Sequence, residues 1–231
     1  MPVGCYVDGV SVNNISYADD MVLLSPSVSA LRKMLSGCEA YAKTHGLVYN
    51  SKKSEVLVFR SKKMNPEHVP AITLNGNDLQ RVSQFKYLGH YVTEDLKDDL
   101  DLERERRALA VRSNMLARRF ARCSKQVKIT LFKAFCQVFY TGSLWVNYTL
   151  KAYNALRIQY NDAFRVLLRL PRFCSASGMF AEARTDDFYA IRRKRVASLL
   201  NRIRRSDNRI LKVIADRPDS SILCTWVNII N

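Results

Sequence analysis

The spacing of hydrophobic positions changes near residue 95. Before that point, short apolar or β-branched runs are typical of strands, and we predict them at residues 10–16, 21–24, 56–59 and 85–92. After Ser25-Pro26, apolar positions recur at helical spacing until Gly46, which predicts one amphipathic helix from Val28. The polar, proline-containing stretch at residues 61–70 predicts a loop. The mixture of strands and a helix predicts an α+β fold class for this part.

Beyond residue 95, long and charged amphipathic segments replace the strand pattern. Acidic residues open the segment 98–122 and arginines close it, as the helix macrodipole favours. Ser124 is a good N-cap for a second helix, and Pro171 ends a third. The third and fourth helices are predicted at residues 146–170 and 188–206. The sequence therefore predicts two domains, a mixed one at residues 1–95 and an all-helical one at residues 96–231.

Basic charge is concentrated in the second part of the chain. The 231 residues are 48% hydrophobic, enough for a sizeable core, and carry a net charge of +16. Residues 1–100 hold 11 Lys+Arg and 11 Asp+Glu, whereas residues 101–231 hold 26 basic and 10 acidic side chains. This asymmetry indicates a polyanion-binding region. The same balance also fits a ribosomal protein, a binder of anionic membranes or charge that only keeps the protein soluble.

The six cysteines are scattered, with no CxxC pair and no nearby His to complete a zinc site. This spacing argues against a zinc knuckle and a disulfide scaffold. The first residues lack a basic segment followed by an apolar run, and charges such as Lys133 break the later apolar stretches. We expect an intracellular protein of the nucleus or cytoplasm, not secreted and without a membrane partner.

The acidic pair Asp19-Asp20 lies between two predicted strands, which predicts a hairpin with the pair at or beside its turn. Nucleotidyl transfer to a 3′-hydroxyl needs two hard cations, and carboxylates are the side chains that hold them. Consecutive strand residues point to opposite faces, so both carboxylates can reach one site only where a turn breaks the alternation. Asp-Asp is also common in ordinary turns. We interpret Asp98-Asp99 and Asp186-Asp187 in that way, because they lack flanking strands.

Several segments resemble a known family in the order that the family has. The sequence ISYADDMVLLSPS from Ile15 resembles the motif C hairpin of reverse transcriptases from non-LTR retrotransposons (LINE-type, jockey-like). In that family a Tyr-x-Asp-Asp turn carries two of the three catalytic carboxylates. GLVYNSKKSEVLVF from Gly46 is similar to motif D, and FKYLGHYV from Phe85 resembles the strand that grips the primer end. YTGSLW from Tyr140 and LLRLPRFCSASGMF from Leu167 resemble the thumb and post-thumb region, so the resemblance spans nearly the whole chain.

The resemblance implies roles for residues of the first part. Asp19 and Asp20 match the metal-binding pair, which would hold Mg²⁺ or Mn²⁺ in a complete active site. Tyr17 matches the turn residue whose ring borders the primer terminus. Lys53 matches the motif D lysine, which is proposed to donate a proton to departing pyrophosphate; alternatively, Lys52 and Lys53 are solvated loop cations.

Nucleic-acid contacts are also expected further along the chain. Leu88 and Gly89 match the primer-grip strand, where glycine allows close approach of a nucleic-acid backbone, although a strand bulge is the structural alternative. Arg118, Arg119 and Arg122 could face a template-primer duplex or form a solvated helix face.

The cluster at residues 192–195 has the same two interpretations, with a nuclear localisation signal as a third. Four phenylalanines at helical spacing are more consistent with core than with base stacking: Phe120, Phe132, Phe135 and Phe139.

The family also uses a third carboxylate from an earlier strand and a fingers region. Asp8 is the only acidic residue ahead of the pair, and we expect it to belong to the same hairpin. Met1 is accordingly expected to begin a truncated copy or a partial gene model. We therefore expect a fragment of an RNA-directed DNA polymerase, inactive alone, with a partial palm at residues 1–95 and a basic helical thumb at residues 96–231.

The expected partners are an RNA template, a DNA primer and the missing upstream polymerase region, and the sequence leaves the oligomeric state open. One alternative is a non-catalytic nucleic-acid-binding module derived from a retrotransposon. Another is a helical interaction protein whose charge is only solubilising. Binding that weakens steeply with salt would separate the first two functions from the third.

Overall fold

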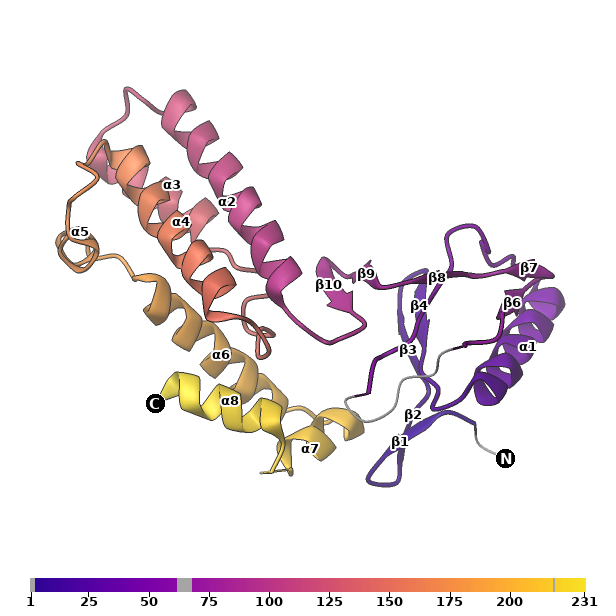
Figure 1. The fold of residues 1–231 in the computed structure, drawn as a ribbon. Coiled ribbons are helices and arrows are strands. Elements are labelled where there is room, and N and C mark those ends of the chain that lie inside the picture. Colours follow the sequence, from indigo (N-terminus) through magenta and orange to yellow (C-terminus); the bar gives the residue numbers. More distant parts are fainter. Residues whose placement is uncertain (1–2, 62–67, 218) are drawn as a thin grey trace. The chain divides into compact units, whose positions relative to one another are not determined.

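The computed structural model describes residues 3–61, 68–217 and 219–231, and it has the α+β fold class that the sequence predicts (Figure 1). Residues 62–67 of the predicted loop lie outside the described residues. The chain divides into two compact units. The first takes in the described residues of Met1–Phe85, Thr93–Asp95 and Ser206–Arg217. The second takes in those of Lys86–Val92, Leu96–Arg205 and Pro218–Asn231.

The described strands are short and pair two at a time. They are β1 Cys5–Val7, β2 Val10–Val12, β3 Asn14–Tyr17, β4 Asp20–Leu23, β5 Glu55–Leu57, β6 Thr73–Leu74, β7 Asn77–Asp78, β8 Gln80–Val82, β9 Gln84–Tyr87 and β10 His90–Thr93. Strands β1 and β2, β3 and β4, and β6 and β7 form antiparallel pairs, and β5 and β8 form a parallel pair. Strands β9 and β10 also pair with each other.

Glycine in three of the tight turns explains why these strands reverse so sharply. Asp8-Gly9, Asn75-Gly76 and Leu88-Gly89 all have positive φ at both positions, as a two-residue type I′ turn requires. Residues 85–92, predicted as one strand, are therefore two strands with a turn between them. The apolar residues on both sides of Leu88-Gly89 form one continuous run in the sequence, and that run conceals the turn.

Helix α1 (Val28–His45) confirms the helix predicted before Gly46. The Ser27 hydroxyl accepts a hydrogen bond from the Ala30 amide, and Gly46 ends the helix in the left-handed conformation. Leu35 on its inner face packs with Ile72 and Leu74 into a small core.

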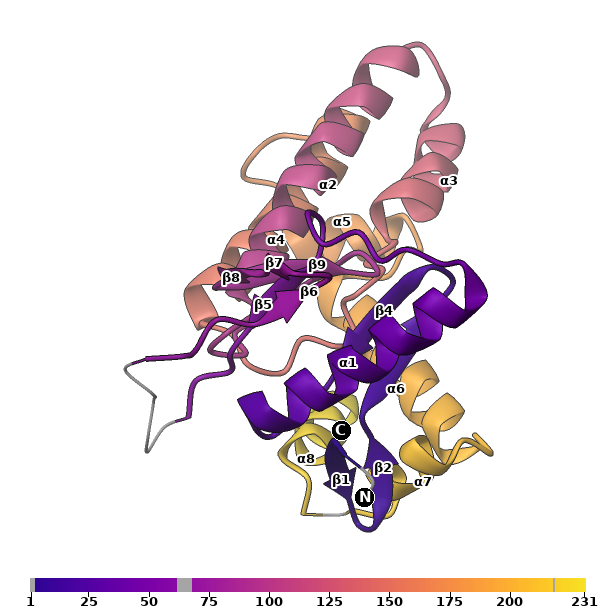
Figure 2. The same ribbon diagram turned by 90° about the vertical axis from the view of Figure 1, so that its right-hand side faces the viewer.

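A segment from late in the chain completes this first unit. Helix α7 (Arg209–Ala215) packs against β2, and Figure 2 shows it beside the β1–β2 hairpin. Just beyond it, Arg217 forms an ion pair with Asp8, with 2.8 Å between Nε and Oδ2. The sequence pattern predicted no helix here, because seven residues give too short a periodic signal.

The second unit is helical apart from its hairpin segment. Its helices are α2 Asp99–Arg119, α3 Lys125–Cys136, α4 Leu150–Leu168, α5 Ala176–Glu182, α6 Phe188–Arg204 and α8 Ser221–Ile230. Helices α2, α3 and α4 lie side by side, and α8 packs on α6 (Figure 1). The four helices predicted here are confirmed, although the third begins only at Leu150, where the Thr149 hydroxyl caps it.

Aromatic side chains fill the core of the helical unit. Phe132 packs against the rings of Tyr160 and Phe164 at centroid distances of 5.1 and 4.8 Å. Phe139 is also buried, and Phe120 packs partly against this core, as expected. Phe135 was predicted as core, but it is 47% exposed because it lies on the outer face of α3.

A buried carboxylate joins the start of α2 to the loop that leads into α4. Asp101 has no exposed surface, and it accepts hydrogen bonds from the Thr141 hydroxyl (2.6 Å), the Trp145 indole N–H (2.7 Å) and the Arg104 Nε (2.7 Å). A buried charge is tolerable only with such partners, because an unpaired one loses its hydration without compensation.

Asp98 is a second buried carboxylate, so its interpretation as an ordinary turn residue was wrong. Its Oδ2 accepts hydrogen bonds from the backbone amides of Val146 and Asn147, both at 2.8 Å. The sequence pattern missed this role because the partners lie almost fifty residues away.

The pKa values of the two carboxylates are shifted in opposite directions. Burial raises the pKa of Asp98 more than its two backbone hydrogen bonds lower it. Burial also acts to raise the pKa of Asp101, but His90, Arg104, Thr141 and Trp145 together hold that pKa well below its ordinary value.

We predict that Asp101→Asn lowers the free energy of unfolding at pH 7 by about 3 kcal/mol, because it leaves buried donors without a charged partner. The depressed pKa of Asp101 means that its contribution is present above the unfolded value of about 3.9 and is lost as the pH falls below it. Urea unfolding from pH 7 to pH 3 measures both effects. Asp98→Asn is the matched control. It should lower the free energy of unfolding by less, since the raised pKa of Asp98 favours the neutral form of that carboxyl group. An equal decrease in the free energy of unfolding for the two variants would contradict the conclusion that Asp101 contributes more as a charged group than Asp98 does.

We predict that Leu88→Asn raises the free energy of unfolding by about 0.5–1 kcal/mol, because asparagine tolerates the left-handed conformation better than leucine does. Leu88 has φ of +45°. Thermal unfolding measures the change, and Lys86→Asn on the adjacent strand β9 should not stabilise the protein. A loss of stability in Leu88→Asn would show that contacts of the leucine side chain outweigh its backbone strain.

Candidate functional site

The hairpin of β3 and β4 confirms the prediction that the acidic pair lies at a turn. Tyr17 pairs with Asp20 across the hairpin, so Ala18 and Asp19 alone form the connection. Ala18 adopts φ of +53°, and this local reversal breaks the alternation of side chains that a continuous strand would impose. Asp19 and Asp20 can therefore both reach the same end of the hairpin.

One face of this hairpin is open. The strand register places Tyr17 and Asp20 on the same face as Ile15, and Tyr17 is 65% exposed. Leu23 lies on the opposite face and packs against the small core under α1. Both carboxylates are exposed to solvent. The side of the hairpin that carries the predicted chemistry is thus not covered by the core of its own unit.

The acidic pair does not by itself make a complete metal site. The described residues include no group of three or more His, Cys, Asp or Glu side chains that could hold an ion. Asp8 was expected in the same hairpin, but it lies in the turn of the preceding hairpin, where Gly9 completes the tight reversal. Two carboxylates can bind a hard cation weakly, and Mg²⁺ needs further oxygen ligands for its octahedral shell.

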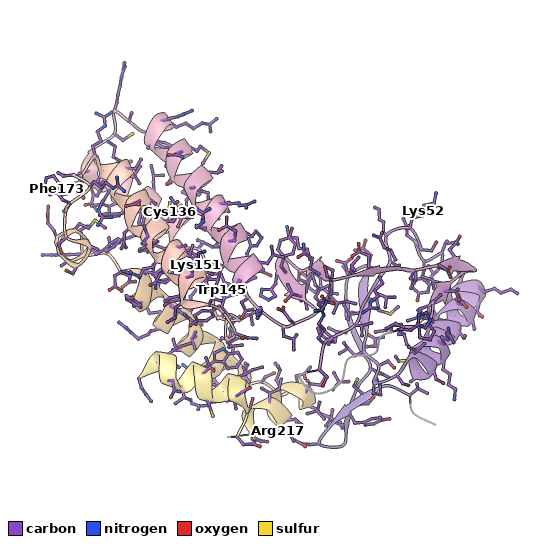
Figure 3. The ribbon with its side chains drawn as sticks, viewed as in Figure 1. Lys52, Cys136, Trp145, Lys151, Phe173 and Arg217 are labelled. Atoms are coloured by element: carbon purple, nitrogen blue, oxygen red, sulfur yellow. The ribbon has the colours of Figure 1, made fainter. Side chains whose placement is uncertain are left out.

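Among the described residues, the hydrogen bonds of Lys53 are made with Asn50 and not with the acidic pair. The Lys53 backbone amide donates to the carbonyl oxygen and the side-chain oxygen of Asn50, at 3.1 and 3.2 Å, and its side chain is exposed. Within the described ranges, no hydrogen bond or ion pair connects its ammonium group to Asp19 or Asp20. Lys52 projects outward from the same turn (Figure 3). Both interpretations of these lysines therefore stay open.

Leu88 and Gly89 form a hairpin turn, so the alternative of a strand bulge was wrong. A Cβ atom on Gly89 would lie 3.5 Å from Cε1 of Tyr140, which shows how closely the turn approaches that ring. Tyr140 is 70% exposed. It follows Phe139 in the loop after α3. The resemblance included it in a thumb-like motif, but the sequence pattern predicted no contact for its ring, because a single aromatic residue in a loop has no periodicity.

The arginines at the end of α2 gain neighbours from α4. Helices α2 and α4 begin together, because Asp99 accepts a hydrogen bond from the Thr149 amide at 2.8 Å. With 21 and 19 residues they are each about 30 Å long, so their C-terminal ends also lie together. We call this region the arginine end; its members are Arg118, Arg119, Arg122, Arg169 and Arg172.

The arginine end is exposed and carries unbalanced positive charge. In the part of the chain that the structure describes, no carboxylate lies within ion-pair distance of its five guanidinium groups, whereas the nearby Arg165 pairs with Asp162. Phe173 lies beside Arg172 and is 91% exposed, at the outer end of the bundle in Figure 3. Two helix C-termini also favour cations here.

The cluster at residues 192–195 is only partly a surface feature. Arg192 is buried, with its guanidinium carbon 4.8 Å from the ring centre of Tyr148 and 4.7 Å from that of Tyr153. It also donates a hydrogen bond to the Trp145 carbonyl oxygen at 3.0 Å. Its interpretations as a nucleic-acid contact, a solvated residue or part of a localisation signal were therefore wrong, because it stabilises the core.

The cysteines and helices add two observations. No disulfide joins the cysteines of the described residues, and burial raises the pKa of the Cys136 thiol to about 11. None of the described helices combines the length and the apolar character that crossing a bilayer would require.

No family model and no curated protein matches the chain. The resemblance to LINE-type reverse transcriptases therefore rests on the motifs and on the surfaces that carry them.

Proposed function

We propose that this chain is the palm-hairpin and thumb part of a LINE-type RNA-directed DNA polymerase. In that role it extends a DNA primer along an RNA template once further palm and finger elements complete the active site. The observation that carries the proposal is the exposed pair Asp19 and Asp20 at the two-residue turn of a hairpin, where Asp20 pairs across the hairpin with the exposed Tyr17.

The residues of the hairpin would have different roles in nucleotidyl transfer. Asp19 and Asp20 would hold Mg²⁺ or Mn²⁺, which supply charge stabilisation for the attacking and leaving oxygens when bound. The open face beside them leaves room for a primer terminus, and the ring of Tyr17 would border its last nucleotide. The turn of Leu88 and Gly89 would contact the primer backbone, which glycine allows to approach closely.

The same geometry supports the expectation that the chain alone does not polymerise DNA. Two adjacent carboxylates leave most of the octahedral shell of Mg²⁺ to water, and positioning of both ions makes up much of phosphoryl-transfer catalysis. A third carboxylate and a nucleotide-binding surface from another segment would supply what is lacking.

We predict that the chain alone incorporates no nucleotides, whereas a version extended at its N-terminus with the fingers and upstream palm of a LINE-type element does. Primer extension on an RNA template with Mg²⁺ or Mn²⁺ measures this. Asp19→Ala in the extended protein should reduce incorporation by at least about 10³-fold, since it removes a metal ligand.

Asp8→Ala is the matched control, because Asp8 occupies a hairpin turn but pairs with Arg217. It should leave incorporation near the unmodified level. Incorporation by the chain alone that disappears in Asp19→Ala would overturn the prediction of inactivity. An extended protein that remains equally active with Asp19→Ala would overturn the role of the acidic pair.

The second candidate function is a non-catalytic nucleic-acid-binding module. The arginine end favours it, because five exposed guanidinium groups without carboxylate partners can neutralise phosphates. This function requires the positive charge of the helical unit and does not require the acidic pair.

We predict that the chain binds duplex nucleic acid with an affinity that falls steeply as salt rises. Replacing Arg118, Arg119 and Arg122 with Gln should reduce the slope of log affinity against log salt by up to about 2.7, at about 0.9 for each phosphate that an arginine neutralises. Fluorescence anisotropy at several salt concentrations measures the slope. The control is Arg106→Gln with Arg107→Gln, since both arginines are paired with Glu103 on the same helix. A flat salt dependence would contradict both nucleic-acid functions.

A further inference from the structure

An open groove lies in the helical unit between the end of α3, the loop that follows it and α6. It has a volume of about 340 Å³. Its cationic side chains come from both sides, with Lys133 on α3 and Lys194, Arg195 and Arg202 on α6. Asp186 is the acidic residue in its lining. Four cations against one carboxylate make the groove strongly basic.

Hydrogen bonds to carbonyl oxygens hold two of these four cations in place without neutralising them. The ammonium group of Lys133 donates to the Arg184 carbonyl oxygen at 3.1 Å, and a guanidinium nitrogen of Arg195 donates to the Gln137 carbonyl oxygen at 3.3 Å. Lys194 pairs with Asp186 at 2.6 Å. Carbonyl oxygens carry no net charge, so Lys133 and Arg195 keep theirs for an anionic ligand.

The groove continues along one face of α6. Lys194, Ser198 and Arg202 line it at intervals of four residues, which places them on the same side of the helix. They also line a neighbouring hollow of about 620 Å³, together with Asn201 and Arg205. The basic stripe from residue 194 to residue 205 is about 16 Å long, at 1.5 Å per residue. That length suits a backbone with several phosphates.

An aromatic ring lies beside this stripe. Tyr140 lines the groove with its side chain largely in solvent, and Val138 lines it nearby. The ring is not buried with the aromatic core, although the adjacent Phe139 is. The Leu88-Gly89 turn also lies close to this ring. An exposed tyrosine beside a row of cations is the combination on which unpaired bases stack while phosphates meet positive charge.

We propose that this groove binds single-stranded nucleic acid, with phosphates along α6 and a base stacked on Tyr140. The proposal rests on the proposed function in that it takes nucleic acid as the partner. A single strand fits better than a duplex, because bases inside a duplex stack on each other and leave no free face for the ring. The volume also lies at the small end of the range of about 300–1,000 Å³ for small-ligand pockets, which suits a nucleotide.

The test is equilibrium binding of the full chain to fluorescein-labelled oligo(dT), oligo(U) and a mixed-sequence duplex, measured by fluorescence anisotropy. The chain should bind the single strands, and its binding of the duplex should not depend on Tyr140. Tyr140→Ala should weaken single-strand binding by about 5- to 150-fold, the loss expected for one stacked base. Tyr140→Phe should retain affinity because it keeps the ring. Tyr140→Leu should resemble Tyr140→Ala, because it keeps apolar surface without a planar face.

The charge of the stripe is tested separately. Arg202→Gln with Arg205→Gln should lower the slope of log affinity against log salt by about 1.4, at about 0.7 per phosphate of a single strand. Phe135→Ala is the matched aromatic control, and Lys151→Gln is the matched charge control. Both residues are exposed and lie outside the groove, and Lys151 is labelled in Figure 3. Both variants should bind as the unmodified chain does.

Three results would overturn the groove as the site: single-strand binding unchanged in Tyr140→Ala, duplex binding weakened by Tyr140→Ala as much as single-strand binding, or no single-strand binding at all. Circular dichroism of each variant shows whether it is folded, and Tyr140→Phe against Tyr140→Leu separates stacking from bulk. Primer extension by the extended protein is read independently. If primer extension depends on Asp19 but single-strand binding does not depend on Tyr140, only the groove proposal is contradicted. If single-strand binding depends on Tyr140 but the extended protein does not extend a primer, only the polymerase function is contradicted.

Discussion

The buried carboxylate of Asp101 holds together the part of the helical unit that carries its functional surface. It ties the start of α2 to Thr141 and Trp145, forty and more residues further along the chain. Tyr140 directly precedes Thr141, so the same hydrogen bonds fix the loop that presents its ring to solvent. A polar network in the core thereby positions an exposed aromatic residue, which hydrophobic packing alone would not orient.

Arg192 makes a comparable connection from the other side of the groove. Its guanidinium group lies against Tyr148 and Tyr153 and donates to the Trp145 carbonyl oxygen, which joins α6 to the loop before α4. Because α6 is held this way on its buried side, Lys194 and Arg202 can occupy its exposed, basic side. One run of four cations thus serves both structure and surface charge.

The local parts of the candidate site could be predicted from the sequence. The strands around Tyr17-Ala18-Asp19-Asp20 and the helix that ends at Gly46 depend on contacts within a few residues, and both are present as expected. The Asp8-Gly9 and Asn75-Gly76 turns carry equally local signals, since these dipeptides favour type I′ turns, and they could have been found in the same way. Leu88-Gly89 is harder, because leucine gives no such signal.

Local sequence was enough to specify the longer helices, the place of the acidic pair in its hairpin and the concentration of positive charge. These properties follow from backbone preferences and side-chain spacing over a few turns or strands. Tertiary packing was needed to bury Asp98, Asp101 and Arg192, to gather the arginine end from two helices, and to place Tyr140 beside a basic groove. The physical reason is that burial and electrostatic environment depend on partners far away in the chain, and a local pattern does not specify those partners.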